Sequence, residues 1–335
     1  MTGLSIFSKA PGIVTAILIV FGVELYLHND DFLDRYRSVF AVGRAADKVA
    51  YVARTQPSIV LLGNSRVDNG ISPVAVSAVI GKETTGVFNL GIPGQNTRVL
   101  SGVVRELESR GALTATRMKY VLIGLDPTLF SLDDELNYSV FLADRWEMAS
   151  AGEYSELAAS IFRLWGYSSN LKGLREPGRM RDFIAATLTD REPWGGSLRD
   201  NLGYRAKKEE MTEPERKTVP EDTLPKPLDP KALAYLSNAV RRLLSHDMRV
   251  GVFFPPQYGR KNDFEKRDAA YEQYRIVLAD LRRRGVEILH IENSDTYAAS
   301  LFSDPGHLNE AGAKRYSTSL ARAMKETWPN LGLAE

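Results

Sequence analysis

Two segments of the chain, far apart in the sequence, carry the residue types that serine catalysis uses. A serine hydroxyl becomes a nucleophile when a histidine lies within hydrogen-bond reach and a carboxylate orients that histidine. Of the four histidines, His28 borders an apolar N-terminal run, His246 ends a predicted helix and His290 falls inside a predicted strand. Only His307 lies in a loop with a carboxylate at a suitable offset, in the run SDPGHLNEAG.

The loop around His307 predicts a fixed pair of side chains. Asp304 precedes His307 by three residues, and the intervening Pro-Gly favours a tight turn that brings the carboxylate to the imidazole. Asn309 can cap a helix that starts at Glu310 and so fix the loop to a rigid element. The alternative is a helix-capping loop with an exposed histidine and no chemistry.

The candidate nucleophile is Ser65, in the run LLGNSRVDNG. It follows a short apolar run that predicts a buried strand, and Gly63 permits a tight turn that projects the hydroxyl from the edge of the sheet. Ser65 can instead be an ordinary helix-cap or turn serine. Because two such segments both follow the pattern of a catalytic site, we expect Ser65, His307 and Asp304 to converge.

Four blocks of the sequence resemble, in order and spacing, those of the SGNH (GDSL-like) hydrolase superfamily. They are GNSRVDNG, NLGIPGQNT, VLIGLDP and DPGHLNEAG, and the resemblance spans residues 58–127 and 251–327. It implies a flavodoxin-like three-layer α/β/α fold, with Ser65 as nucleophile, His307 as base and Asp304 as its partner. It also implies that the Ser65 backbone N–H and Gly94 donate to the oxyanion.

The layout resembles most closely the membrane-anchored SGNH-like proteins of bacterial envelope acylation. These include the D-alanyl transfer protein family and the partners of membrane-bound O-acyltransferases. The Asp-x-x-His pair follows the serine here, whereas it precedes the serine in alginate acetylation proteins.

The third block departs from the superfamily pattern. Where the family has an asparagine that donates to the oxyanion, this chain has Asp126, whose ionised carboxylate only accepts hydrogen bonds. Either Asp126 points elsewhere, or the oxyanion hole uses Asn96 or backbone donors. Losing one such donor typically lowers the rate by about 10²–10³-fold. The site can therefore be slow, specialised for transfer, or inactive.

Arg66 and Arg98 are candidates for binding a carboxylate or phosphate of the substrate, because a guanidinium binds such groups with two hydrogen bonds. The alternative is a structural ion pair with Asp68 or Asp126, and Asp126 itself is a third candidate substrate contact. Trp146 and Trp165 can form a wall for stacking sugars, although we expect them to pack in a core.

Apolar runs and helical patterns alternate along the chain, which predicts an α/β fold with a parallel sheet covered on both faces. The carboxyl ends of such strands meet at one edge, where ligands bind, so Ser65, Gly94 and Asp126 are expected at that edge. Strands are predicted at 58–65, 86–91, 120–126, 248–254 and 286–291, and helices at 32–54, 97–111, 230–245, 264–284 and 310–327. The interval 132–229 breaks the alternation and predicts an insertion over this edge, helical at first and loop-like from about residue 190.

The N-terminal run PGIVTAILIVFGVELYL is apolar except for Thr15 and Glu24. Seventeen helical residues span roughly 25 Å, slightly less than a hydrocarbon core. Lys9 before the run and acidic residues after it place the N-terminus in the cytoplasm by the positive-inside rule. We expect an uncleaved anchor; a cleaved signal peptide and a buried core helix are the alternatives.

These features divide the chain into successive segments with distinct predicted roles. The ranges are 1–10 (cytoplasmic N-terminus), 11–28 (transmembrane anchor), 29–57 (connecting helical segment), 58–131 (first part of the SGNH-like domain), 132–229 (insertion or lid) and 230–335 (second part of that domain).

Bulk composition excludes several functions. The formal net charge is +1, which gives no electrostatic footprint for nucleic acid, and the absence of cysteine excludes disulfides, a cysteine nucleophile and thiolate metal sites. No phosphate-binding Gly-rich loop or clustered metal-ligand set is present, so we expect no metal and no cofactor.

The leading hypothesis is a periplasm-facing O-acyltransferase or esterase of the bacterial inner membrane. It would act on an envelope glycan through a Ser65 acyl-enzyme, with a membrane-bound O-acyltransferase as candidate partner. A general carboxylesterase or lipase-like hydrolase is the first alternative. A catalytically silent scaffold that binds a membrane acyltransferase or a glycan is the second.

Overall fold

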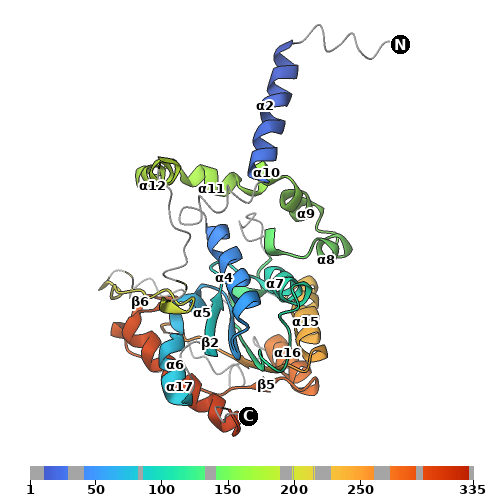
Figure 1. Cartoon of the computed structure of the whole chain (residues 1–335). Helices are drawn as coiled ribbons and strands as arrows, with labels where there is room; N and C mark the ends of the chain where they lie inside the picture. Colours follow the sequence, from blue (N-terminus) through green and yellow to red (C-terminus); the bar gives the residue numbers. More distant parts are fainter. Residues whose placement is uncertain are drawn as a thin grey trace.

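The computed structural model describes ten stretches of the chain and shows an α/β fold built on a parallel sheet (Figure 1). The described residues are 11–28, 41–81, 86–132, 141–188, 198, 200–213, 215, 228–259, 272–291 and 297–331. The predicted segment 1–10, residues 29–40 of the predicted connecting segment 29–57, part of the insertion and residues 264–271 of the helix predicted at 264–284 lie outside them.

Five parallel strands form the sheet in the order β2-β1-β3-β4-β5. Since β1 pairs with β2 on one side and with β3 on the other, the winding direction of the chain reverses between β1 and β3. Ligand sites of open α/β sheets form at such a reversal, outside the carboxyl ends of the strands. The strands are β1 (Ile59–Gly63), β2 (Val87–Gly91), β3 (Tyr120–Gly124), β4 (Arg249–Phe253) and β5 (Glu287–Ile288).

Alternate side chains of each strand enter two separate apolar cores, one on each face of the sheet. Val60 and Leu62 of β1 belong to one core, and Ile59 and Leu61 belong to the other; all four are fully buried. Burial of each such side chain contributes about 1.5–3 kcal/mol. The strands therefore contain near-continuous apolar runs, as expected for a parallel sheet buried on both faces.

Each face of the sheet is covered by helices from both the N-terminal and the C-terminal half of the chain. The first core includes side chains from α4, α7, α15 and α16, and the second includes side chains from α5, α6 and α17. These helices are α4 (Ala41–Thr55), α5 (Ser65–Gly70), α6 (Pro73–Ile80), α7 (Thr97–Ser109), α15 (Pro230–Ser245), α16 (Glu272–Arg283) and α17 (Glu310–Thr327).

The insertion leaves the carboxyl edge after β3 and a short 3₁₀ turn, η2 (Pro127–Phe130), and its first part is helical as expected. Figure 1 shows α10 at the foot of the N-terminal helix α2 (Pro11–Leu27), with α11 and α12 extending from there to one side, apart from the sheet. The insertion helices are α8 (Arg145–Ser150), α9 (Tyr154–Ile161), α10 (Arg163–Gly166), α11 (Ser168–Gly173) and α12 (Pro177–Leu188).

Helix α2 coincides with the apolar N-terminal run and has 17 residues. Within the described ranges, no helix combines the length and the apolar character that crossing a membrane requires.

The observed elements differ from the predicted ones mainly at their ends. The first strand stops at Gly63, so Ser65 begins a helix and does not end a strand. The last predicted strand, 286–291, shortens to two residues, which pair with β4. The helices predicted at 230–245 and 310–327 are confirmed to the residue.

Candidate active site

Ser65 lies at the junction between strand β1 and helix α5, where the backbone turns sharply. Gly63 has φ of 152°, and a Cβ there would lie 2.4 Å from a methyl carbon of Val67, so only glycine fits. Asn64 caps α5 through its side-chain oxygen, which accepts a hydrogen bond of 3.0 Å from the Arg66 N–H. The turn leaves Ser65 partly exposed at the carboxyl edge of the sheet, as predicted.

A two-stranded hairpin brings His307 to Ser65. Strands β6 (Phe302–Asp304) and β7 (His307–Leu308) pair antiparallel, and Asn309 caps the following helix α17 by accepting from the Gly312 N–H at 3.0 Å. His307 Nε2 lies 2.8 Å from Ser65 Oγ, although the two residues are 242 positions apart. The convergence expected from the sequence is present in the structure.

Asp304 holds the other side of the imidazole. Its carboxylate oxygens lie 2.8 and 3.0 Å from His307 Nδ1. Since a carboxylate accepts and does not donate, the proton of a neutral imidazole is assigned to Nδ1, which leaves Nε2 to accept from the serine hydroxyl. Ser65, His307 and Asp304 thus have the connectivity of a serine–histidine–aspartate triad.

Lys207 is a further partner of Asp304 that the sequence analysis missed. Its ammonium donates to Asp304 Oδ2 at 2.6 Å, and the Gly306 N–H donates to Oδ1 at 2.9 Å. Burial by itself raises the pKa of the Asp304 carboxyl, but hydrogen bonds from His307 and Lys207 outweigh it and hold that pKa well below its usual value. The carboxylate therefore stays ionised beside the histidine.

Lys207 belongs to the later part of the insertion, which we expected to be loop-like. Residues 204–212 form no helix or strand, yet backbone hydrogen bonds fasten them to the site. The Arg205 N–H donates to the Asp68 carbonyl at 3.0 Å, and the Glu310 N–H donates to the Lys207 carbonyl at 2.8 Å. This segment is a fixed wall of the site. Ninety-seven residues separate Lys207 from Asp304, so no local pattern could have revealed the pair.

Asp126, which stands where the resemblance expects an asparagine, is 2% exposed and tied into a polar network. It forms an ion pair with Arg66, and its Oδ2 accepts from Asn64 Nδ2 at 2.6 Å. Its Oδ1 accepts from the N–H and the hydroxyl of Thr128 at 2.8 and 2.6 Å. The ion pair compensates the charge of Asp126, and the contacts direct its side chain toward the residues on either side of Ser65.

Arg66 connects the two loops of the triad. Besides Asp126, its guanidinium donates to the Gly306 carbonyl at 3.2 Å and to the Thr128 hydroxyl at 3.2 Å. Gly306 lies between Asp304 and His307, so Arg66 fixes the serine loop relative to the histidine loop. Of the two readings left open by the sequence, the structure shows the structural ion pair for Arg66.

A buried ion pair lies under helix α5. Lys48, which is 1% exposed, donates to Asp68 Oδ1 at 2.7 Å and to the Gly91 carbonyl at 2.6 Å. Arg205 approaches the second oxygen of Asp68 at 3.0 Å. Lys48 shares the apolar face of α4 with Val49 and Val52, so its position was a readable signal that the sequence analysis did not use.

The residues expected to form the oxyanion hole lie in the loops after β1 and β2. These loops are joined, because the Ile92 N–H donates to the Gly63 carbonyl at 2.8 Å. Gly94 has φ of 70° in a tight turn, and no described residue accepts a hydrogen bond from the Ser65 N–H. Asn96 caps α7, since its Oδ1 accepts from the Val99 N–H at 3.1 Å.

Arg98 lies in a different environment from Arg66. Its guanidinium forms a bidentate ion pair with Glu153, with N–O distances of 2.6 and 2.9 Å. The Tyr235 hydroxyl donates to the same carboxylate at 2.7 Å. Burial alone would raise the pKa of Glu153, but the Arg98 and Tyr235 hydrogen bonds lower it. The contact joins α7 and α15 to the insertion and does not involve Asp68 or Asp126.

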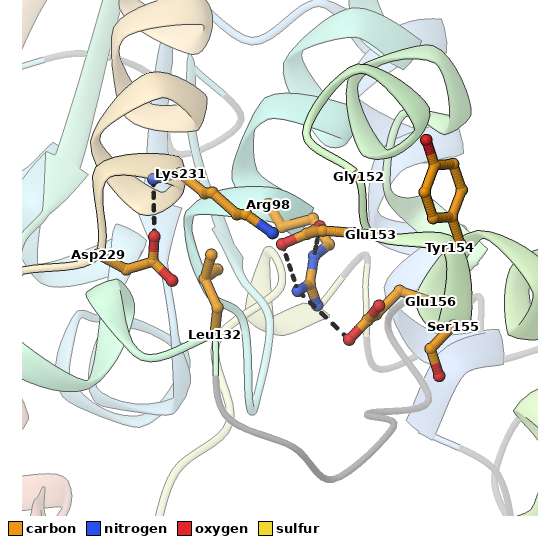
Figure 2. A pocket seen from close by; sticks show the side chains of 9 residues that line it. All are labelled: Arg98, Leu132, Gly152, Glu153, Tyr154, Ser155, Glu156, Asp229 and Lys231. Carbon is orange, nitrogen blue, oxygen red and sulfur yellow. Dashed lines mark hydrogen bonds and ion pairs between the residues drawn. The ribbon is translucent and has the colours of Figure 1, made fainter.

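The pair lies in the wall of a pocket of about 360 Å³, and Figure 2 shows the Lys231 side chain extending toward Glu153. None of the triad residues lines the pocket. Because Glu153 engages both prongs of the guanidinium, an anionic substrate would have to displace it to bind Arg98.

Trp146 and Trp165 are exposed at 74% and 45%. The expectation that they pack in a core is therefore wrong, since Trp146 of α8 and Trp165 of α10 both reach the surface of the insertion.

The described residues hold no group of three or more His, Asp or Glu side chains arranged to bind a metal ion. No protein-family model matches the sequence, and no curated protein matches it.

Proposed function

We propose that this protein is a membrane-attached serine acyltransferase or esterase of the SGNH type, which acts on a bacterial cell-envelope polysaccharide from the periplasmic side. The observation that carries the proposal is the continuous hydrogen-bonded chain from Ser65 Oγ through the His307 imidazole to the Asp304 carboxylate. An ordinary cap or turn serine does not require an imidazole at 2.8 Å whose ring is oriented by a carboxylate.

The arrangement of the sheet supports the same family assignment. A parallel sheet with strand order β2-β1-β3-β4-β5 is the arrangement of flavodoxin-like folds. Ser65 and Asp126 follow the two strands that flank the reversal point, where such folds bind their ligands. We therefore assign the chain to the three-layer α/β/α class that the SGNH resemblance implies.

The chemistry proceeds in two steps. Ser65 Oγ attacks the carbonyl carbon of an ester, His307 Nε2 takes the hydroxyl proton, and the C–O bond to the leaving alcohol breaks as that proton passes to it. In the second step a glycan hydroxyl or water gives its proton to His307 and attacks the acyl-Ser65 ester; the acyl C–O bond to Ser65 breaks, and His307 returns the proton to Ser65 Oγ. Asp304 stays ionised and stabilises the imidazolium in both steps.

The carbonyl oxygen becomes negatively charged in each step and needs donors. The Ser65 N–H and Gly94 are the donors we propose, and both lie in the loops that β1 and β2 direct to this edge. Asp126 does not oppose them, since Arg66 neutralises it and Thr128 and Asn64 bind its oxygens. The missing amide donor leaves a weaker oxyanion hole, which suits transfer from a reactive donor better than broad lipolysis.

Reaction with a fluorophosphonate probe tests the first step. We expect Ser65 to be labelled in the wild-type protein, and labelling to be lost in Ser65→Ala. Ser109→Ala, a substitution on the surface of α7, is the matched control and should label normally. If wild type and Ser65→Ala label equally while both remain folded by circular dichroism, Ser65 is not an activated nucleophile and the silent-scaffold alternative replaces this proposal.

The acceptor is tested with an aryl acetate as donor and an acetyl-free envelope oligosaccharide as acceptor. Acetylated oligosaccharide that depends on Ser65 supports transfer. Release of acetate without any gain from the oligosaccharide indicates a general carboxylesterase. Co-purification with a membrane-bound O-acyltransferase would identify the partner that supplies the acyl group.

A further inference from the structure

Exposed apolar side chains gather in two neighbouring parts of the molecule. Of the twenty large hydrophobic side chains that are exposed in the described ranges, nine lie on α2 and nine lie between residues 146 and 188. Only Val74 and Ile276 are exposed elsewhere in the described part. The surface of the α/β body is therefore polar, and the apolar surface is confined to α2 and the insertion.

Helix α2 is apolar on all sides. Five consecutive residues, Ile17 to Phe21, are each between 54% and 64% exposed. Successive residues of a helix point about 100° apart, so these side chains cover its whole circumference. A helix that is apolar all round is stable in the core of a large protein or in a membrane, and nothing in the described chain encloses this one.

Six of the nine side chains in the second group lie on α10, α11 and α12 or at Phe162, and we name this set of residues (162–188) the insertion band. Phe162, Trp165, Ile184 and Leu188 are exposed at 57%, 45%, 49% and 79%. Exposed basic residues are interspersed with them, namely Lys172, Arg175, Arg179 and Arg181. Exposed aromatic, aliphatic and basic side chains on short helices are typical of segments that lie in the headgroup region of a bilayer.

A specific junction fixes α2 to the insertion band. The Glu24 carboxylate accepts hydrogen bonds from the backbone N–H groups of Arg163 and Leu164, at 2.5 and 2.9 Å. The His28 ring lies 3.1 Å from the Ile161 carbonyl oxygen and 3.1 Å from Glu24. Figure 1 shows the result: α2 stands upright on α10, and α11 and α12 extend from its foot to one side. The hydrogen bonds of Glu24 and His28 therefore fix the direction of α2 relative to the insertion band.

We propose that the insertion band is a docking surface for a phospholipid bilayer, lying flat among the headgroups where α2 enters the membrane. The surface rests on the proposed insertion of α2, but not on the chemistry of Ser65. Residues 162–188 contain five basic and two acidic side chains, which favours anionic headgroups. Because the insertion leaves the sheet at its carboxyl edge, docking turns that edge, and Ser65 with it, toward the membrane.

The absence of native cysteine allows a direct test with single labelled positions. The full-length variants Ile184→Cys and Leu188→Cys report on the band, Leu18→Cys reports on α2, and Ile276→Cys is the control, since Ile276 is 60% exposed on the α/β body. Each is labelled with an environment-sensitive fluorophore and reconstituted into phosphatidylcholine–phosphatidylglycerol vesicles. Lipids that carry a nitroxide near the headgroup then quench labels in the interface, and lipids that carry it on the acyl chain quench a label at residue 18 when α2 is inserted.

We expect quenching at residues 184 and 188 to be at least about threefold stronger than at 276, and weaker in vesicles without phosphatidylglycerol. Quenching at residue 18 with none at 184 or 188 would overturn the docking surface and leave the anchor standing. Quenching at none of these positions would overturn both, while fluorophosphonate labelling of Ser65 would still report separately on the catalytic proposal. A signal at 184 that vanishes on dilution into excess lipid would indicate contact between copies of the chain, and would also overturn the proposal.

Discussion

The carboxyl edge of the sheet and the insertion band solve opposite problems of solvation. At the edge, charged side chains are buried or partly buried, and each has partners: Lys48 with Asp68, Arg66 with Asp126, and Lys207 with Asp304. In the band, large apolar side chains such as Trp165 and Leu188 are exposed without cover from the described chain. The edge is complete within one molecule, whereas the band is stable only beside something apolar. In the proposals made above, the first arrangement serves chemistry and the second serves attachment.

The sharpest test of the edge is to remove the negative charge of Asp304 while keeping the shape of its side chain. In Asp304→Asn the amide can present its N–H to His307 Nδ1, which favours the wrong tautomer and leaves Nε2 unable to accept from Ser65. We expect the rate of aryl acetate hydrolysis to fall by about 10⁴-fold. Asp280→Asn, on α16, makes the same chemical change and should leave the rate unchanged. An Asp304→Asn rate within tenfold of wild type would remove Asp304 from the triad.

Two isoleucines provide a matched test of the difference in packing between the two regions. Ile123 on β3 is fully buried, and Ile184 in the band is 49% exposed. We expect Ile123→Ala to lower the free energy of unfolding by about 2–5 kcal/mol, because it opens a cavity in the core. Ile184→Ala should change it by no more than about 0.5 kcal/mol. Urea denaturation measured in detergent checks both values. A large loss at Ile184 would mean that the band packs as a core and is not an exposed surface.

The smallest expected effect concerns Lys207 and depends on pH. Lys207 helps to lower the pKa of Asp304, so Lys207→Met should raise that pKa toward its usual value. A carboxyl whose pKa is lowered in the folded state stabilises the fold above its unfolded pKa, and that stability is lost as the pH falls through the folded pKa. The pair is partly exposed, so we expect a loss of at most about 1 kcal/mol at neutral pH.

The difference in the free energy of unfolding between wild type and Lys207→Met should close at acidic pH. It closes as the pH falls from the folded-state pKa of Asp304 in the variant to the lower folded-state pKa of Asp304 in the wild type. Urea denaturation between pH 7 and strongly acidic pH measures it. Lys208→Met removes the same charge from an exposed neighbour and should show no such closing. A gap that is independent of pH would mean that Lys207 contributes packing alone.

The sequence alone determined the alternation of strands and helices and the local geometry of the histidine loop. Those features depend on residues that are close in the sequence. Apolar runs predict buried strands, Asn309 caps a helix by binding the N–H of Gly312 three residues later, and Asp304 reaches His307 across one turn. Such patterns repeat over a few residues, and the backbone geometry of helices, turns and strands converts them directly into contacts. The same reasoning placed Ser65 at the carboxyl edge of the first strand, although the element it begins is a helix.

Tertiary structure alone decided which partners the charged side chains have and which apolar side chains remain exposed. Arg66 and Arg98 are similar in sequence context, yet one pairs with Asp126 across the edge and the other with Glu153 of the insertion. Lys207 reaches Asp304 across 97 residues and His307 reaches Ser65 across 242. Ion pairs and hydrogen bonds of this kind follow from how the elements pack, because a charge is compatible with many partners until the fold brings one of them within about 3 Å.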